Sequence, residues 1–187
     1  MIEKLKVQLK SHLRETQSNL NATLIPSSVI VLIISANSTY KILFNKRTND
    51  VQDHKGEISF PGGRMDKNDL DLLSTALREF EEEMGISYAN IDIIGRLSDV
   101  PTSSNYLITP YVATTNSKLN FSPNPKEVDL IIEIPINELM KQENLRSEFR
   151  VTNNEPLKYN CYSYRGNFIW GATARILTEL LTMIERE

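Results

Sequence analysis

The sequence predicts a mixed α/β (α+β) fold in which helices and a β-sheet pack in layers. Three observations favour this fold. Apolar residues recur at helical spacing near both ends of the chain and once in the middle. The segments between these helices hold β-branched and aromatic runs bounded by polar turns. With 187 residues, 40% of them hydrophobic and 24% charged, the chain has the size and composition of one folded domain, which we expect over residues 1–187.

The N-terminal half is expected to contain a helix, a β-hairpin and a second helix. In chain order, the elements are a helix over about residues 2–16, a connection over 17–27, strands over Val29–Ser35 and Tyr40–Arg47, a polar loop over 48–56, a short strand over Glu57–Phe60 and a helix over 70–84. The second helix has an apolar face made of Leu70, Leu73, Leu77, Phe80 and Met84. We expect Asn68 or Asp69 to cap its start and Gly85 its end.

The C-terminal half is expected to be richer in strands and to close with a helix. Its expected elements are strands over Ile91–Asp99, Tyr106–Thr115 and Val128–Ile134, a loop over 116–126, a short helix near 136–142, two strands within 146–165 and a helix that begins near Trp170. We expect the Trp170–Arg175 segment to pack this last helix against the sheet rather than to contact a substrate.

Composition excludes several classes of protein. The net charge of −3 gives the chain no overall electrostatic reason to bind nucleic acid or anionic lipid, so we expect neither as a partner. Cys161 is the only cysteine, which excludes a disulfide within the chain. The longest strongly apolar run, Val29–Ile34, is much shorter than the roughly 20 residues of a membrane span. The charged N-terminal segment lacks the apolar core of a signal peptide, and we expect a cytoplasmic protein.

The second helix carries an unusual set of acids. Glu79, Glu82 and Glu83 are spaced i, i+3, i+4, so at about 100° per residue they point to one side of the helix, away from its apolar face. Three close carboxylates repel one another, and a divalent cation removes that cost. Oxygen ligands without His or Cys favour Mg²⁺ or Mn²⁺, which commonly bind together with substrate phosphates. The alternative is a solvated helix face with ordinary Glu–Arg pairs.

The surrounding residues make this segment resemble the Nudix box, whose family pattern is G-x5-E-x7-R-E-U-x-E-E-x-G-U, with U a bulky aliphatic residue. The box spans residues 63–86, and the matching positions are Gly63, Arg78, Glu79, Glu82, Glu83, Gly85 and Ile86. Phe80 stands where an aliphatic residue is usual, and the gap between Gly63 and Arg78 is one residue longer than in the pattern. The isolated glutamate of the pattern therefore has no direct counterpart, and Asp69 is the nearest acid.

Further segments resemble the coenzyme A pyrophosphatase branch of this family, whose upstream signature is L-L-T-x-R-[SA]-x3-R-x3-G-x3-F-P-G-G. The residues in register with it are Leu43, Arg47, Gly56, Phe60, Pro61, Gly62 and Gly63, whereas Phe44, Asn45, Thr48 and Gln52 depart from it. The late segment Ile169–Arg175 is also similar to this branch. The resemblance covers residues from about 25 to 183.

The resemblance implies a Nudix-type α/β/α sandwich, with a mixed β-sheet between helices, and hydrolysis of a nucleoside diphosphate linked to another group. It implies Glu79, Glu82 and Glu83 as ligands of Mg²⁺ or Mn²⁺, with Glu83 or Glu82 assisting deprotonation of the attacking water. Arg78 would hold a glutamate of the box in place, and the backbone carbonyl of Gly62 or Gly63 would be a further ligand.

Outside the box, the candidates are less tightly constrained. Glu127, just before a strand, is either an additional metal ligand or base, or a solvated strand-end residue. The candidate substrate-binding residues are Arg47, Lys55, Arg64 and His54.

The leading hypothesis is a hydrolase that cuts coenzyme A or its derivatives to 3′,5′-ADP and 4′-phosphopantetheine. Two alternatives stay open. One is a Nudix hydrolase of another nucleotide, such as ADP-ribose, a dinucleoside polyphosphate or a damaged nucleotide. The other is a non-catalytic Nudix sensor or interaction module. Relatives in the family commonly dimerise, so a homodimer is compatible with the sequence, although no residue pattern indicates one.

Overall fold

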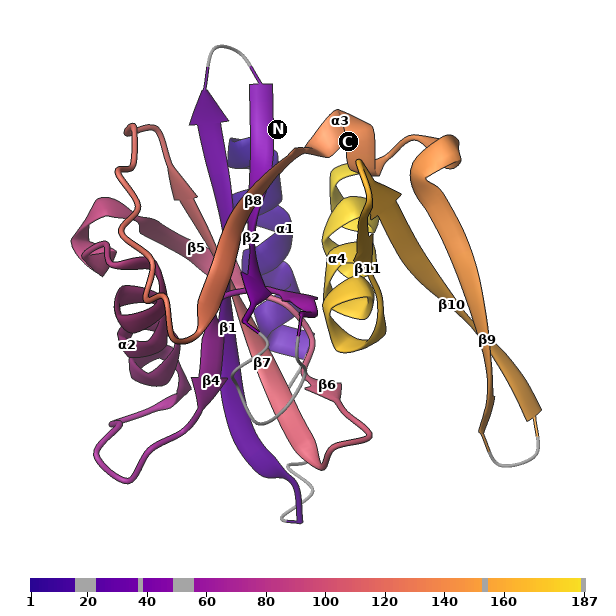
Figure 1. Cartoon of the computed structure of the whole chain (residues 1–187), viewed down its shortest axis with the longest axis horizontal. Helices are drawn as coiled ribbons and strands as arrows, with labels where there is room; N and C mark the ends of the chain where they lie inside the picture. Colours follow the sequence, from indigo (N-terminus) through magenta and orange to yellow (C-terminus); the bar gives the residue numbers. More distant parts are fainter. Residues whose placement is uncertain (16–22, 37–38, 49–55, 153–154, 186–187) are drawn as a thin grey trace.

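A large mixed β-sheet forms the centre of the molecule (Figure 1). The computed structural model describes residues 1–15, 23–36, 39–48, 56–152 and 155–185. The strands of this sheet are β1 (Ile25–Ala36), β2 (Thr39–Arg47), β3 (Ile58–Ser59), β4 (Gly62–Arg64), β5 (Asp92–Arg96), β6 (Val100–Pro101), β7 (Tyr106–Thr115) and β8 (Val128–Pro135). The main strand order is β3-β2-β1-β7-β5, while β4 pairs with β1, β6 with β7 and β8 with β2. The β1–β7 pair is parallel and the other pairs are antiparallel, so the sheet is mixed.

Helices cover both faces of this sheet, as expected for an α/β/α sandwich. Helix α2 (Leu72–Met84) lies on one face, and α1 (Ile2–Glu15) and α4 (Gly171–Glu185) lie on the other (Figure 1). The central strand β1 explains why: Val29, Val31 and Ile33 pack toward α1 and α4, whereas Ile30, Leu32 and Ile34 pack toward α2. A strand buried on both faces appears in the sequence as a continuous apolar run.

A smaller sheet follows the main one. Where two strands are predicted within 146–165, the structure has three: β9 (Leu145–Thr152), β10 (Glu155–Tyr164) and β11 (Asn167–Ile169), in the order β11-β10-β9. Four side chains join this sheet to the core beside α4, namely Leu145, Tyr162, Tyr164 and Ile169. The Tyr162 hydroxyl also lies 2.8 Å from Thr178 Oγ1 of α4. The β9–β10 hairpin projects beyond α4 (Figure 1).

Several boundaries differ from the sequence prediction for identifiable reasons. Strand β1 begins at Ile25, inside the predicted connection, because Ile25 pairs with Tyr106 of β7. Helix α2 is capped by Asp71, not by Asn68 or Asp69: Asp71 and Ser74 form a reciprocal capping box. Leu70 therefore lies before the helix and is 93% exposed, so its assignment to the apolar face was wrong.

Other elements agree more closely with the prediction. Gly85 ends α2 in the left-handed conformation, with φ of 65°. The predicted helix near 136–142 is α3 (Ile136–Leu139), followed by a 3₁₀ turn, η2 (Gln142–Asn144). A second 3₁₀ turn, η1 (Tyr88–Asn90), follows α2.

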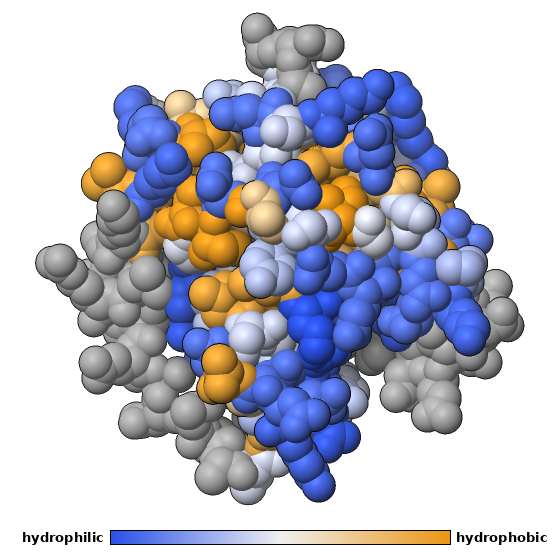
Figure 2. All heavy atoms as spheres, turned by 90° about the vertical axis from the view of Figure 1, so that its left-hand side faces the viewer, coloured by the Kyte–Doolittle hydropathy of each residue, from blue (hydrophilic) through white to orange (hydrophobic). Residues whose placement is uncertain are grey.

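The surface beside α2 is mixed in character. Figure 2 shows hydrophobic side chains interspersed with hydrophilic ones on this face.

None of the helices within the described residues has the length and hydropathy of a membrane span.

Candidate functional site

The Gly62–Gly63 turn sets the distance between the sheet and α2. Gly62 has φ of 151°, and a Cβ at this residue would collide with the Ser28 carbonyl oxygen of β1. A Cβ at Gly63 would stand 2.6 Å from the carboxyl carbon of Glu79. Gly62 thus has to be glycine, because a side chain would meet the backbone of β1, whereas a Cβ at Gly63 would require the Glu79 carboxylate to move.

Glu83 is buried in the sheet rather than displayed beside the other two acids. Its side chain is 2% exposed, and its Oε2 accepts hydrogen bonds from Asn45 Nδ2 at 2.9 Å and from the Gly62 N–H at 3.0 Å. Arg47 Nη1 lies 3.6 Å from Oε1. Burial raises the pKa of Glu83 from its ordinary value of 4.5 to about 8. The Gly62 N–H and Arg47 oppose this rise, and the charges of Glu79 and Glu127 add to it.

Arg78 ties the remaining acids of the box together. It binds Asp69 through Nε and Nη2, both at 2.9 Å, and its Nη1 lies 2.8 Å from Glu79 Oε1 and 3.1 Å from Glu82 Oε2. Its Nη2 also approaches the Arg64 carbonyl oxygen at 3.4 Å. The hydrogen bond with Arg78 holds the pKa of Asp69 far below its ordinary value of 3.8. Asp69 thus anchors the arginine despite the longer gap in the box.

Glu127 reaches the site through the loop that follows β7. The Ser122 and Asn124 N–H groups donate to the carbonyl oxygens of Met84 and Glu83, at 3.0 Å each, which docks this loop on the end of α2. Asn124 Nδ2 then donates to Glu127 Oε1 at 3.1 Å. The loop that caps the end of α2 therefore also positions Glu127.

Some of these groups line a cavity of about 620 Å³. Its lining holds acidic, basic and aromatic side chains, and the acidic ones are Glu57, Glu79, Glu83, Glu127 and Glu148. The basic side chains are Arg47, Arg64 and Arg175, and the aromatic ones are Phe60, Tyr106, Tyr159 and Trp170. A cavity with such a lining can hold an anionic group beside its guanidinium groups and a ring beside its aromatic side chains.

Only some of the sequence-predicted residues line the cavity. Glu79 and Glu83 line the cavity, whereas Glu82 does not and its side chain is 55% exposed. Most of the Trp170–Arg175 segment also lines the cavity, while Ala174 within it packs in the core as expected. His54 and Lys55 lie outside the described residues.

Sequence reasoning missed Asn45 and Ser59. Asn45 is fully buried, and Ser59 Oγ donates to its Oδ1 at 2.6 Å. The sequence did hold a signal for Asn45, which follows the apolar run Ile42–Phe44 in the same strand. A polar side chain buried at such a position needs hydrogen-bond partners.

The donors of the cavity suit a hard divalent cation. Burial raises the pKa of Glu79, and the neighbouring charges of Glu82 and Glu127 contribute to the rise, although Arg78 opposes it. Acids that raise one another's pKa are stabilised by a cation, and carboxylate oxygens suit Mg²⁺ or Mn²⁺. Among the described residues, no three acidic, His or Cys side chains stand close enough to hold a metal ion as they are. Glu79 and Glu82 each have one oxygen committed to Arg78, so metal binding requires side-chain rotation here.

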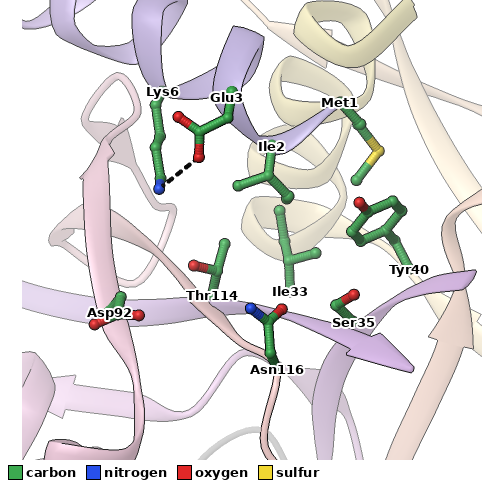
Figure 3. Close-up of a pocket in the computed structure, with 10 residues that line it drawn as sticks. All are labelled: Met1, Ile2, Glu3, Lys6, Ile33, Ser35, Tyr40, Asp92, Thr114 and Asn116. Atoms are coloured by element: carbon green, nitrogen blue, oxygen red, sulfur yellow. Dashed lines mark hydrogen bonds and ion pairs between the residues drawn. The ribbon is translucent and has the colours of Figure 1, made fainter. Parts of the chain in front are cut away.

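A second cavity, of about 330 Å³, lies beside α1 at the other end of the sheet (Figure 3). Its lining includes the Lys6–Glu3 ion pair, at 2.9 Å, together with Asp92, Thr114 and Tyr40. None of the sequence-predicted site residues that the structure describes lines it, so the cavity beside α2 is the candidate active site.

Comparison with known proteins agrees with this geometry. The family model described as the NUDIX domain matches residues 25–153. A protein named uncharacterized Nudix hydrolase NudL, from Photorhabdus laumondii, is 30% identical over 158 residues, which cover 84% of each chain. A protein of the same name from Yersinia pestis is 34% identical over 145 residues, covering 76% of this chain and 72% of that protein.

Solved structures support the fold. A MutT/nudix family protein from Enterococcus faecalis superposes with a TM-score of 0.57 at 11% identity, covering 97% of this chain and 70% of that one. An Ap4A hydrolase from C. elegans gives 0.53 at 14% identity, covering 59% of this chain and 80% of that one. Nudix hydrolases generally use divalent metal ions and act on small nucleotide substrates. With its matched domain, its box residues and its similarity to NudL proteins, the chain belongs to the Nudix family and is a hydrolase of phosphoric anhydride bonds.

Proposed function

We propose that this protein uses Mg²⁺ or Mn²⁺ to hydrolyse the diphosphate of coenzyme A or its derivatives, releasing 3′,5′-ADP and 4′-phosphopantetheine. The observation that carries the proposal is one cavity lined by the box acids Glu79 and Glu83 together with three arginines. Coenzyme A has a phosphate monoester besides its diphosphate, so its charge suits a cavity with several guanidinium groups. The upstream residues in register with the coenzyme A branch, Arg47 among them, support the same substrate.

We assign the metal site to Glu79, Glu82 and Glu83, with the Gly63 carbonyl as a backbone ligand and Glu127 as an additional one. A bound divalent cation would neutralise the diphosphate and lower the pKa of water. Within the chain, Arg78 holds Glu79 and Glu82.

We assign Glu83 or Glu82 as the base that accepts the proton of the attacking water. Oε1 of Glu83 is the candidate atom, because its Oε2 already accepts two hydrogen bonds. Glu82 is the alternative, and it requires the longer side-chain movement because it stands outside the cavity lining.

Substrate binding is assigned to the basic residues around the cavity. Arg47 and Arg64 would contact phosphate oxygens, and Lys55 and His54 would contribute from the adjoining segment. We also propose that residues 1–187 act as one domain. A homodimer is a separate hypothesis, which sedimentation equilibrium of the purified chain tests.

Product analysis by chromatography tests the proposed function. The purified chain is incubated with Mg²⁺ or Mn²⁺ and, separately, with coenzyme A, ADP-ribose, NADH and a diadenosine polyphosphate. Release of 3′,5′-ADP from coenzyme A is the expected result, lost in Glu83→Gln and kept in Glu81→Gln, a matched change of an acid on the same helix that does not line the cavity. Selective cleavage of another compound would overturn the coenzyme A assignment, and cleavage of none would favour the non-catalytic module.

A further inference from the structure

Ser59, which lines the cavity, and the buried Asn45 form a hydrogen-bonded chain that ends on Glu83. Ser59 Oγ donates to Asn45 Oδ1 at 2.6 Å, and Asn45 Nδ2 donates to Glu83 Oε2 at 2.9 Å. Asn45 is 0% exposed and Glu83 1% exposed, so water does not compete for these groups. The strands position the chain: Asn45 of β2 pairs directly with Ser59 of β3.

The chain fixes the direction of the Asn45 amide. A carboxylate only accepts hydrogen bonds, so the amide must present its NH₂ to Glu83 and its carbonyl to the other neighbour. The Ser59 hydroxyl can supply the donor that this carbonyl needs. Without Ser59, the Asn45 oxygen would be a buried acceptor without this partner, and the orientation of the amide would be less strongly determined.

Asn45 also determines which oxygen of Glu83 is available. Oε2 receives both the Asn45 amide and the Gly62 N–H, whereas Oε1 lies 3.6 Å from Arg47 Nη1, and both Arg47 and Glu83 line the cavity. Two donors on one oxygen hold the carboxylate plane, and the other oxygen is left for a cation or a proton.

We propose that Asn45, oriented by Ser59, is a positioning residue that directs Oε1 of Glu83 into the active-site cavity. The inference rests on the proposed function only in assigning Glu83 to the metal site. Polar groups that orient metal ligands typically affect metal affinity or activity by about 10- to 100-fold, and we expect that range for Asn45→Leu, which has similar volume and no donor.

The test compares Asn45→Leu with the wild type by Mn²⁺ titration, followed by electron paramagnetic resonance, and by steady-state kinetics. We expect Mn²⁺ affinity and kcat each to fall by about 10-fold or more, with KM changed by less than about threefold, because the substrate contacts are kept. Thr109→Val is the matched control: Thr109 is 1% exposed, donates to Asp99 Oδ1 at 2.7 Å and does not line the cavity. It should lower stability while leaving Mn²⁺ affinity and kcat unchanged.

The part played by Ser59 is tested by a double-mutant cycle. Ser59→Ala alone should lower Mn²⁺ affinity and kcat by about two- to fivefold, and it should add nothing in the Asn45→Leu background. If the double variant loses as much Mn²⁺ affinity and kcat as the two single variants combined, the inference that Ser59 acts through Asn45 is refuted. If Asn45→Leu does not fold, Ser59→Ala carries the test, and unchanged Mn²⁺ affinity in that variant would refute the proposal.

Failure of this inference can be told apart from failure of the proposed function. The Mn²⁺ titration needs no substrate. A wild type that binds Mn²⁺ but cleaves no tested compound would refute the substrate assignment and leave the positioning inference testable. A folded Asn45→Leu variant with wild-type Mn²⁺ affinity and kcat would refute the positioning inference alone.

Discussion

Replacing Glu83 with glutamine should stabilise the metal-free protein at pH 8 while abolishing its activity. In the fold, the pKa of Glu83 rises from 4.5 to about 8, chiefly because the carboxylate is buried. Between these two values the native state retains a proton that the unfolded state has released. The free energy of unfolding therefore falls as the pH rises from 4.5 to 8.

The size of the effect follows from the pKa difference. At about 1.4 kcal/mol for each pKa unit, the charged side chain costs at most about 5 kcal/mol when fully ionised. Relaxation of the site reduces this, so we expect Glu83→Gln to be more stable than the wild type by about 1–3 kcal/mol at pH 8. At pH 5 the difference should be below about 1 kcal/mol, because this pH is only slightly above the ordinary pKa of 4.5, so little of the cost of keeping the proton has accumulated.

Urea denaturation in EDTA, at pH 5 and at pH 8, measures both differences. Adding Mg²⁺ should stabilise the wild type more than the glutamine variant, because only the wild type retains the full acid set. The reasoning would be refuted if Glu83→Gln were less stable than the wild type at pH 8, or if the two proteins differed equally at both pH values.

The remaining predictions address other contacts of the site. Asp69→Asn should lower the free energy of unfolding at pH 7 by about 1–2 kcal/mol, since it removes the partly buried charge that binds Arg78; urea denaturation measures it, and an unchanged value would contradict it. Because the pKa of Asp69 is depressed in the fold, its contribution is present above pH 3.8 and is lost as the pH falls further; the stability of the wild type should therefore approach that of Asp69→Asn at low pH, and a gap between them that stays constant below pH 3.8 would disprove its part. Arg47→Ala should raise KM for coenzyme A more than it changes kcat, and an unchanged KM would exclude Arg47 from substrate binding. Gly63→Ala should displace Glu79 and lower Mn²⁺ affinity about 10-fold with the fold retained, whereas normal affinity would argue against this packing.

The elements that local sequence determines were predicted well, and those that depend on distant partners were not. The run Val29–Ile34 predicts a buried strand by itself, but its extension to Ile25 depends on pairing with Tyr106, far along the chain. The spacing of Glu79, Glu82 and Glu83 predicts their direction on α2. It does not reveal that β2 and the Gly62 turn would offer donors to Glu83 alone, which draws this acid into the sheet.

The three box acids are therefore held in two different ways, and the difference has a physical reason. Glu79 and Glu82 are held by Arg78, a charged partner on the same helix that Asp69 anchors. Glu83 is held on one oxygen by a strand amide and a backbone N–H, which carry no charge, and Arg47 stands 3.6 Å from its other oxygen. A carboxylate kept without a full countercharge destabilises the metal-free protein, and this is the arrangement that gains most when a divalent cation supplies the missing charge.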